Sequence, residues 1–458
     1  MPDPSSGLLN SALSRRSLLT ALGLAGAGAA LAGCGAPGGG GADSLQQADM
    51  RIPDQYKDRT PVLFWAPWTK EPLAALEGMI KQFNESQKDI AVVVESQESY
   101  ATLNTKLSAA VQAKRVPDVV CFPEFQWLQF YFSDLFVQLD PYFDDTFKLD
   151  NYLDAFLEQC QAAGKTYLVP FARSTPLFYY NKSAYTKAGL PEEGPKTWDD
   201  LAEFAPALAR TKVAGKPMKA FAFGVEDQWF GQAEVWAWGG QYSDGYNVTI
   251  DQDPVIEWWD WQRKFIHDNK FGYMAEVAMT DYEGGLAAGA HGSTASLTAA
   301  TTLSKFDVGA AFMLGQQQDE TEVPTGGSGL SAIKADSKDR QDAAVELFKF
   351  LGTPEMSAQW HKATGYVPIV KAAADTKIVK DLQASDPNYL VAMNQLKNAK
   401  TADRISWFQS AVTEINQSMT KIYGDNTPAA DVVKTLKPKL DEIMEKNKSD
   451  LDKVINAS

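Results

Sequence analysis

Between residues 62 and 122, short apolar runs alternate with helical patterns, and this alternation most constrains the fold. The run Val62-Leu63-Phe64-Trp65 is continuously apolar, which is typical of a strand buried on both faces. Helical spacing of apolar residues follows, and the pattern then repeats, with a helix at 73–83, a strand at 91–94, a helix at 103–111 and a strand at 119–122. This βαβαβ order predicts an α/β fold with a parallel sheet wrapped by helices.

Ligands of such folds bind outside the carboxyl ends of the strands. The candidate cleft positions are therefore the segments that follow the three predicted strands, 65–68, 97–100 and 121–124.

The chain is too long for one compact core, because about 400 residues exceed the usual size of a single domain. From Asn151 onward helical patterns dominate, with strands predicted only at 167–169, 177–180, 221–223 and 307–312. We therefore expect two α/β lobes, the second rich in helices.

The N-terminus carries the features of an export signal. Arg15 and Arg16 precede a short apolar run that ends in Leu31-Ala32-Gly33-Cys34. Paired arginines, an apolar stretch and small residues before a cysteine predict a twin-arginine signal over 1–33, joined to a lipoprotein cleavage site. Cys34 would then carry lipid and begin the mature chain. The alternative is an ordinary N-terminal helix, which would not explain the arginine pair or the cysteine.

Residues 34–59 are predicted to be a flexible tether, because five of the seven residues from Gly35 to Gly41 are glycine. No later segment has about eighteen uninterrupted apolar residues, so a lipid anchor alone is expected to hold the protein at the membrane.

The formal charge is −15, and removal of residues 1–33 takes away Asp3, Arg15 and Arg16 and leaves −16. Such a surface repels nucleic acid, so we expect no nucleic-acid partner. Cys121 and Cys160 could form a disulfide in an oxidising compartment, but their spacing in sequence does not decide whether they do.

Recognisable catalytic motifs are scarce. The three histidines, His267, His291 and His361, have no metal-ligand spacing, and phosphate-loop and nucleophile-elbow motifs are absent from the sequence. We expect no cofactor and no metal. Paired carboxylates for sugar hydrolysis remain an alternative, because 58 acidic residues always allow some pair to meet in the fold.

Tryptophans cluster at 229–238 and 258–261. Indole faces stack on sugar rings and attract quaternary ammonium groups. The 258–261 group lies in a predicted helix and is interpreted as core packing, whereas Trp229 follows a turn-like segment and is the better candidate for a ligand contact.

Several strings resemble the family 1 extracellular solute-binding proteins. They are Tyr180-Asn181, Gly189-Leu190-Pro191 and Thr197-Trp198-Asp199. Within that family the chain resembles the glycerol-3-phosphate and glycerophosphodiester-binding subgroup, through the run Ala-Arg-Ser-Thr-Pro-Leu-Phe-Tyr-Tyr-Asn-Lys at 172–182, Thr-Gly-Gly-Ser-Gly-Leu at 325–330 and Thr-Gly-Tyr-Val-Pro at 364–368. The resemblance covers nearly all of residues 60–458.

The resemblance implies a periplasmic-binding-protein-like fold, with a ligand cleft and a hinge between two α/β lobes. The ligand contacts that it implies are Tyr100, Glu124, Ser174, Trp229, Ser293, Gly327 and Tyr366. Glu124 would accept from glycerol hydroxyls, Gly327 would let backbone N–H groups approach a phosphate, and Trp229 would face a choline head group. A late arginine for the phosphate falls on Arg404, slightly out of the expected register.

The resemblance also implies the role. It predicts a lipid-anchored, extracytoplasmic substrate-binding protein of an ABC transporter, a non-enzymatic monomer that passes its ligand to permease subunits. The first lobe would span 60–170 and be completed by about 300–345; the second would span 171–299 and about 346–458. The alternatives are a binding protein for a neutral oligosaccharide, a secreted glycoside hydrolase and a protein that presents ligand to a receptor.

Overall fold

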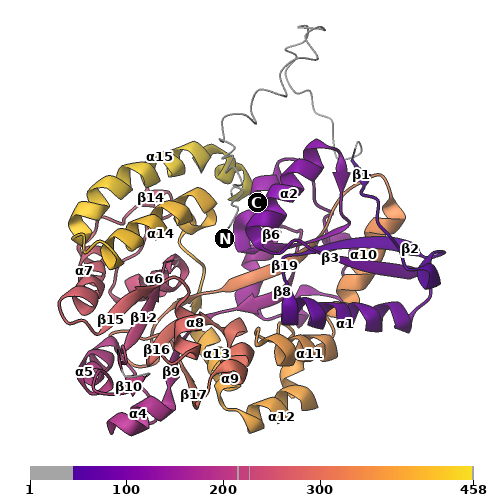
Figure 1. Cartoon of the computed structure of the whole chain (residues 1–458). Coiled ribbons are helices and arrows are strands. Elements are labelled where there is room, and N and C mark those ends of the chain that lie inside the picture. Colours follow the sequence, from indigo (N-terminus) through magenta and orange to yellow (C-terminus); the bar gives the residue numbers. More distant parts are fainter. Residues whose placement is uncertain (1–44, 214–215, 226, 456–458) are drawn as a thin grey trace, which may run out of the picture. The chain divides into compact units, whose positions relative to one another are not determined.

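The computed structural model describes residues 45–213, 216–225 and 227–455 (Figure 1). The predicted signal and Cys34 lie outside these residues. The chain divides into two compact units, Met1–Gly40 and Gly41–Ser458, and nearly all described residues belong to the second. Within the described residues, no helix has the length and apolar character needed to cross a bilayer.

The first sheet has five strands in the order β3-β2-β5-β19-β8. Its strands are β2 (Thr60–Ala66), β3 (Ile90–Ser96), β5 (Val119–Pro123), β8 (Val169–Ser174) and β19 (Gly326–Ala332). Strand β2 pairs in parallel with β3 and β5, as the βαβαβ pattern predicts, but β19 is antiparallel to both of its neighbours.

The second sheet has the order β15-β12-β16-β9-β17. Its strands are β9 (Pro176–Asn181), β12 (Phe221–Gly224), β15 (Gly272–Ala275), β16 (Gly289–Ser293) and β17 (Val308–Ala311). Strand β12 is parallel to β15 and β16, whereas β9 is antiparallel to β16 and β17. The prediction of parallel sheets is therefore corrected to mixed sheets, because strands that arrive from the other sheet run against the local direction.

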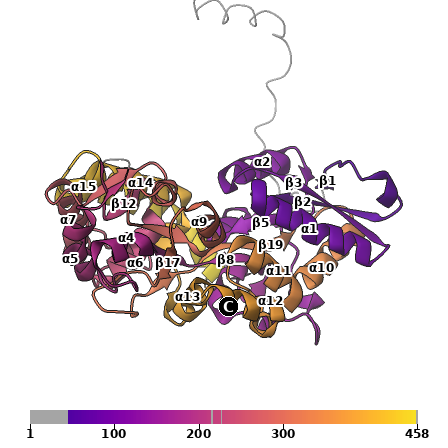
Figure 2. The same cartoon turned by 60° about the horizontal axis from the view of Figure 1, so that its bottom comes forward.

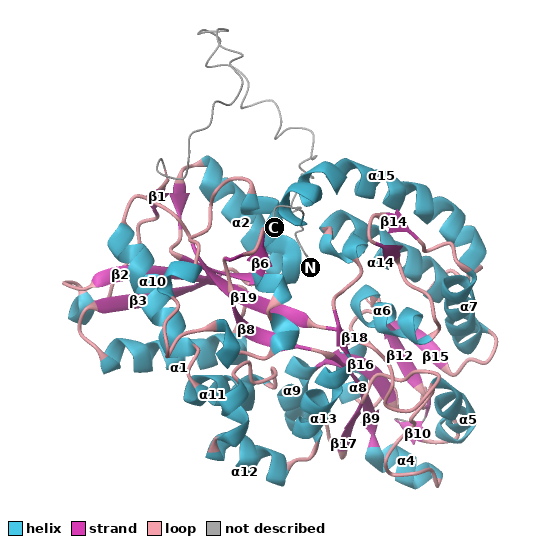
Figure 3. Cartoon of the chain, turned by 180° about the vertical axis from the view of Figure 1, so that it is seen from behind, coloured by secondary structure: helices cyan, strands magenta, loops and turns pink. Residues whose placement is uncertain are grey.

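The chain passes directly from one sheet to the other at Thr175, the single residue between β8 and β9. It returns between β17 and β19. Figure 3 shows these strands in magenta with helices around them. Two sheets, each with its own cover of helices, confirm the prediction of two α/β lobes.

Side chains of the central strands alternate between two apolar layers on opposite faces of each sheet, as the period of a strand requires. In the first sheet, Val119 and Cys121 face one layer and Val120 and Phe122 face the other. In the second, Phe178 and Tyr180 face one layer, and Leu177 and Tyr179 face the opposite one. Each sheet is therefore buried on both faces, which accounts for its continuous apolar runs.

The helices cover these four layers. They are α1 (Lys70–Ser86), α2 (Tyr100–Gln112), α3 (Leu128–Tyr131), α4 (Lys182–Ala188), α5 (Trp198–Leu208), α6 (Gln228–Ala237), α7 (Asp253–His267), α8 (Ala278–Glu283), α9 (Leu297–Leu303), α10 (Lys338–Leu351), α11 (Pro354–Thr364), α12 (Lys377–Ser385), α13 (Asn388–Gln395), α14 (Gln409–Tyr423) and α15 (Ala429–Ile455). Helices α1, α10 and α11 pack against the first sheet (Figure 2). Within the interval 346–458, α11 and the end of α10 thus belong to the first core, whereas α14 and α15 belong to the second.

Ten further strands among the described residues have two residues each, and short 3-10 helices lie between the longer elements. These strands are β1 (Gln46–Gln47), β4 (Arg115–Val116), β6 (Gln161–Ala162), β7 (Lys165–Thr166), β10 (Lys212–Val213), β11 (Lys216–Pro217), β13 (Ser243–Asp244), β14 (Asn247–Val248), β18 (Val323–Pro324) and β20 (Ala399–Lys400). Strand β1 pairs with β4, and Leu45 is buried, so the last part of the segment predicted as a tether takes part in the fold.

Candidate functional site

The amino end of β19 is the point at which most of the predicted site residues meet. Gly327 has φ +88°, a left-handed conformation that residues with a Cβ rarely adopt. A Cβ at this position would stand 1.9 Å from the carbonyl oxygen of Ala172 on the neighbouring strand β8. The pairing of β19 with β8 shifts register between Gly327 and Gly329. Glycine is therefore required here for both the conformation and the close approach of two strands.

Two phenols lie beside this irregular part of β19. Tyr100 begins α2, where the Ser99 side chain accepts from the Thr102 N–H. The Tyr100 hydroxyl donates to Ser328 Oγ at 2.9 Å. Tyr366 follows α11, which ends at the left-handed Gly365, and its ring stacks on Trp360. Burial raises the pKa of both phenols, so both remain hydroxyl donors at neutral pH.

Glu124 lies at the carboxyl end of β5, where the βαβαβ pattern predicts a ligand contact. It opens the 3-10 helix η3 (Glu124–Trp127) with φ +32°, an uncommon conformation for a residue other than glycine. Burial raises the pKa of its carboxyl to about 7, and the positive charge of Arg173 partly opposes that shift.

Ser174 and Trp229 approach β19 from different elements. Ser174 ends β8 and pairs with Gly326. A Cβ on Gly326 would stand 2.4 Å from the Trp229 ring and 3.1 Å from Ser174 Oγ, so the indole of α6 lies directly against the β19 backbone. The indole nitrogen of Trp229 is buried and has no partner among the described residues.

Ser293 ends β16 and lies next to the crossing point of the chain. It pairs with Pro176, and its backbone carbonyl accepts from the Tyr179 hydroxyl at 2.8 Å. The following N–H, that of Thr294, donates to the Thr175 carbonyl at 3.0 Å. A Cβ on Gly365 would stand 2.6 Å from the Thr294 carbonyl oxygen, which joins this corner to Tyr366.

Seven of the predicted residues thus form one contiguous group, which we call the central cluster. Its members are Tyr100, Glu124, Ser174, Trp229, Ser293, Gly327 and Tyr366.

Arg404 lies elsewhere. It begins the 3-10 helix η11 (Arg404–Trp407), and its guanidinium lies over the rings of Tyr246 and Trp407, 4.5 and 5.5 Å from their centroids. Trp407 in turn stacks on Phe125 at 3.9 Å, immediately after Glu124. Gln126, which belongs to η3 with Glu124, donates to Gln409 Oε1 at 3.0 Å. Arg404 is therefore attached to an aromatic group that borders the central cluster at η3.

Sequence reasoning missed several polar residues of this region. Arg173 is 1% exposed and donates to the side-chain oxygen of Gln159, whose amide nitrogen donates to Thr325 Oγ1 at 2.6 Å. Arg173 lies inside the string at 172–182, directly before the predicted contact Ser174. An arginine inside an otherwise apolar strand pattern is the feature of the sequence that indicates a buried charge here.

The two cysteines both lie near Arg173, buried and unbonded to each other. Cys121 donates instead to Ser328 Oγ at 3.1 Å. Among the described residues, no group of three or more histidine, cysteine or acidic side chains is arranged to hold a metal ion.

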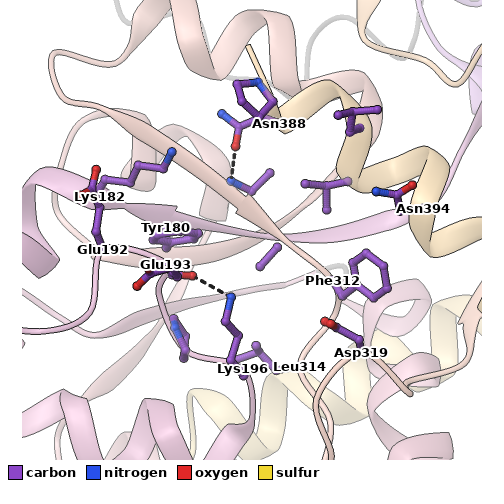
Figure 4. Close-up of a pocket in the computed structure, with 16 residues that line it drawn as sticks. Tyr180, Lys182, Glu192, Glu193, Lys196, Phe312, Leu314, Asp319, Asn388 and Asn394 are labelled. Carbon is purple, nitrogen blue, oxygen red and sulfur yellow. Dashed lines mark hydrogen bonds between the residues drawn. The ribbon is translucent and has the colours of Figure 1, made fainter. Parts of the chain in front are cut away.

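Two cavities lie away from the central cluster. One of about 550 Å³ is lined by Tyr180, Lys182, Lys196 and Asp319 (Figure 4), and Asn388 there accepts from the N–H of Ala310 at the edge of the second sheet. Another, of about 360 Å³, lies along Phe125, Gln126, Trp407 and Gln409. None of the eight predicted contact residues lines either of them.

The central cluster combines one carboxylate, two phenols, two serines, an indole and the glycine-rich start of strand β19. These groups can accept from and donate to a polyol, and the indole can cover an apolar or cationic face. These side chains have the chemistry that binding a small polar molecule requires.

Comparison with known proteins supports this interpretation. The family model of bacterial extracellular solute-binding proteins matches residues 78–389. The sn-glycerol-3-phosphate-binding periplasmic protein UgpB of Escherichia coli K12 is 28% identical over 363 residues, which are 74% of this chain and 81% of that protein. The crystal structure of UgpB from Mycobacterium tuberculosis in complex with glycerophosphocholine is 30% identical and superposes with a TM-score of 0.79, over 85% of this chain and 99% of that one.

More distant structures share the fold alone. The cyclic α-maltosyl-1,6-maltose-binding protein of Arthrobacter globiformis is 19% identical, with a TM-score of 0.70 over 85% of this chain and 100% of that one. The expected fold class and family resemblance are thereby confirmed. The chain belongs to the bacterial extracellular solute-binding proteins and is the substrate-binding protein of an ABC importer.

Proposed function

We propose that the central cluster binds glycerol-3-phosphate or a glycerophosphodiester such as glycerophosphocholine. The observation that carries the proposal is the meeting of the Glu124 carboxyl, the Tyr100 and Tyr366 phenols and the Trp229 indole around the glycine-rich start of β19, where Ser328 pairs with Pro123. The relatives named for glycerol-3-phosphate and solved with glycerophosphocholine support the same ligand class.

Each group has a role in this proposal. The Glu124 carboxylate accepts from the two glycerol hydroxyls, and the serine and phenol hydroxyls bind the remaining oxygens. The Gly327 backbone approaches the phosphate, and Trp229 covers a choline head group by a cation–π contact. Arg404 would have to leave the rings of Tyr246 and Trp407 to reach the phosphate.

That position of Arg404 favours one second candidate, a neutral oligosaccharide. A ligand without a phosphate needs no cation in the site, and it could stack on Trp229 and bind the same hydroxyls and carboxylate.

The remaining parts of the role are also proposed. The lobes close on the ligand, and permease subunits prefer the closed, liganded form. The protein acts as a monomer without catalytic turnover. A hydrolase would instead release product from glycerophosphodiesters or glycosides, and a ligand-presenting protein would be captured with a sensor.

We expect glycerophosphodiesters to raise the melting temperature more than sugars do. A ligand that binds only the folded state at a hundredfold excess over Kd adds about 2.7 kcal/mol to the free energy of unfolding. A thermal-shift panel of glycerol-3-phosphate, glycerophosphocholine, maltose, trehalose and glycerol measures this. A response to maltose or trehalose alone would reject the ligand class and leave the family unchanged. Product formation would indicate a hydrolase.

We also propose that lipid on Cys34 anchors the protein to the membrane. Cys34→Ala should move the protein from the membrane fraction to the soluble fraction, because the only predicted anchor is lost. Fractionation followed by immunoblotting measures the shift, and Ser44→Ala provides a matched control that leaves the cysteine in place. Membrane retention of the Cys34 variant would contradict the anchor.

A further inference from the structure

Arg173 is a buried positive charge directly behind the central cluster. It lies one residue before the end of β8, opposite Gly327 on β19, and is 1% exposed. Its guanidinium lies 5.1 Å from the centroid of the Phe156 ring, and its Nε has no hydrogen-bond partner among the described residues. Burial of an arginine costs free energy unless opposite charge or hydrogen bonds compensate for lost water, so its position needs an explanation.

Gln159 links Arg173 to the helix that carries Glu124. Gln159 belongs to the 3-10 helix η7 (Glu158–Cys160), and its side-chain oxygen accepts from Arg173. Its backbone carbonyl accepts from the Trp127 indole N–H of η3 at 2.9 Å. Its amide nitrogen donates to Thr325, the residue before β19. One glutamine thus holds the guanidinium, η3 and the start of β19 in a common arrangement.

Charge connects the same elements. The guanidinium attracts the Glu124 carboxylate and lowers its pKa, which burial alone raises, and Glu124 in turn favours the charged form of Arg173. The other titratable groups that face this pair are the Tyr100 and Tyr366 phenols and the Cys121 and Cys160 thiols.

Those four groups do not titrate near neutral pH. Burial raises the pKa of each thiol to about 12 and raises the pKa of both phenols. His361 contacts the Tyr366 backbone carbonyl through Nδ1 at 2.6 Å, and burial lowers its pKa. Among these groups, Glu124 is the one whose pKa lies near 7, so a change in its charge is expected in that pH range.

From this geometry we propose that Arg173 is a positioning residue, which holds η3 and its first residue Glu124 in place through Gln159 and places a positive charge behind the Glu124 carboxylate. It acts from behind the β8–β19 pair, through its charge and through Gln159. The proposal rests on the proposed function only in assigning Glu124 to ligand hydroxyls. An ionised carboxylate accepts from two hydroxyls at once, whereas the protonated form must use one oxygen as a donor.

The test is the pH dependence of glycerophosphocholine binding, measured by calorimetry from pH 5.5 to 9 in wild type, Arg173→Gln and Arg173→Lys. Wild-type affinity should fall below a midpoint near the pKa of Glu124, which is about 7. Loss of an opposite charge nearby should raise that midpoint in Arg173→Gln by roughly 1 to 3 pH units. At pH 7 the variant should therefore bind about fivefold more weakly or worse, and its affinity should rise steadily from pH 7 to pH 9. Arg173→Lys keeps the charge and should keep the midpoint.

Glu124→Gln is the matched control. It should abolish the pH dependence of binding, and dependence that persists in this variant would assign the titration to another group such as His361. A uniform loss of affinity at all pH values in a folded Arg173→Gln protein would show a merely structural role and overturn the proposal.

A second measurement does not require ligand. The Glu124 carboxyl ¹³C signal, assigned by its loss in Glu124→Gln, can be titrated in wild type and both Arg173 variants. If Arg173→Gln does not fold, a rise of one unit or more in Arg173→Lys, which retains the charge, would overturn the proposal. If wild type binds no glycerol phosphate, the proposed function fails, but this titration still tests Arg173.

Discussion

Gly327→Ala is expected to destabilise the protein by about 3 kcal/mol or more. A left-handed conformation costs a residue with a Cβ roughly 1–2 kcal/mol, and overpacking a dense interior adds about 1–3 kcal/mol. Both apply here, because φ is +88° and the new Cβ would stand 1.9 Å from the Ala172 carbonyl oxygen. Strand β19 must therefore move away from β8. Urea denaturation measures the free energy of unfolding.

Gly239→Ala separates the two effects. Gly239 has φ +81°, and a Cβ there would meet nothing within 4 Å. In this variant the free energy of unfolding should fall only by the cost of the left-handed conformation, about 1–2 kcal/mol. If Gly327→Ala lowers the free energy of unfolding no more than Gly239→Ala does, the close approach of β8 and β19 at Gly327 is contradicted.

Trp229→Ala is expected to weaken glycerophosphocholine binding by roughly 1 to 3 kcal/mol, or about 5- to 150-fold. The indole lies directly against Gly326 and beside Ser174. Its loss removes an aromatic face from the proposed site and admits water to the start of β19. Calorimetry at fixed pH measures the change in Kd.

Trp238→Ala is the matched control, because Trp238 is also a half-buried tryptophan near α6, but its ring packs on Trp258 with centroids 4.1 Å apart. It should lower the stability of the second lobe and leave affinity unchanged among folded molecules. Equal loss of affinity in both variants, or none in a folded Trp229→Ala protein, would remove Trp229 from the proposed site.

Strands rich in branched and aromatic residues were predictable from the sequence. Strands β2, β3, β5, β9 and β12 all lie at predicted positions. Strands β16 and β19 were missed because their residues are mostly glycine, alanine and serine, which have low strand propensity. They are strands because neighbours on both sides, β9 and β12 or β5 and β8, provide hydrogen-bond partners.

The central cluster also contains residues that local sequence predicts and residues that only tertiary contacts bring in. Glu124 follows a predicted strand, so its place at the edge of the first sheet could be derived from the sequence. Trp229 meets Gly326 only because α6 of one lobe lies against β19 of the other, a contact between residues 97 positions apart in sequence. Local patterns carry no information about such a contact.

Sequence by itself determined the α/β class, two cores and the family, because these depend on residue periodicity and on strings of neighbouring residues. Only the tertiary structure decided that both sheets are mixed, that Arg404 lies on Tyr246 and Trp407, and that Arg173 is buried behind Glu124. The physical reason is that strand direction and the pairing of buried charge depend on which distant segments meet. In this protein the chain joins its two sheets through the single residue Thr175 and returns through β19, so the central cluster exists only once both crossings are made.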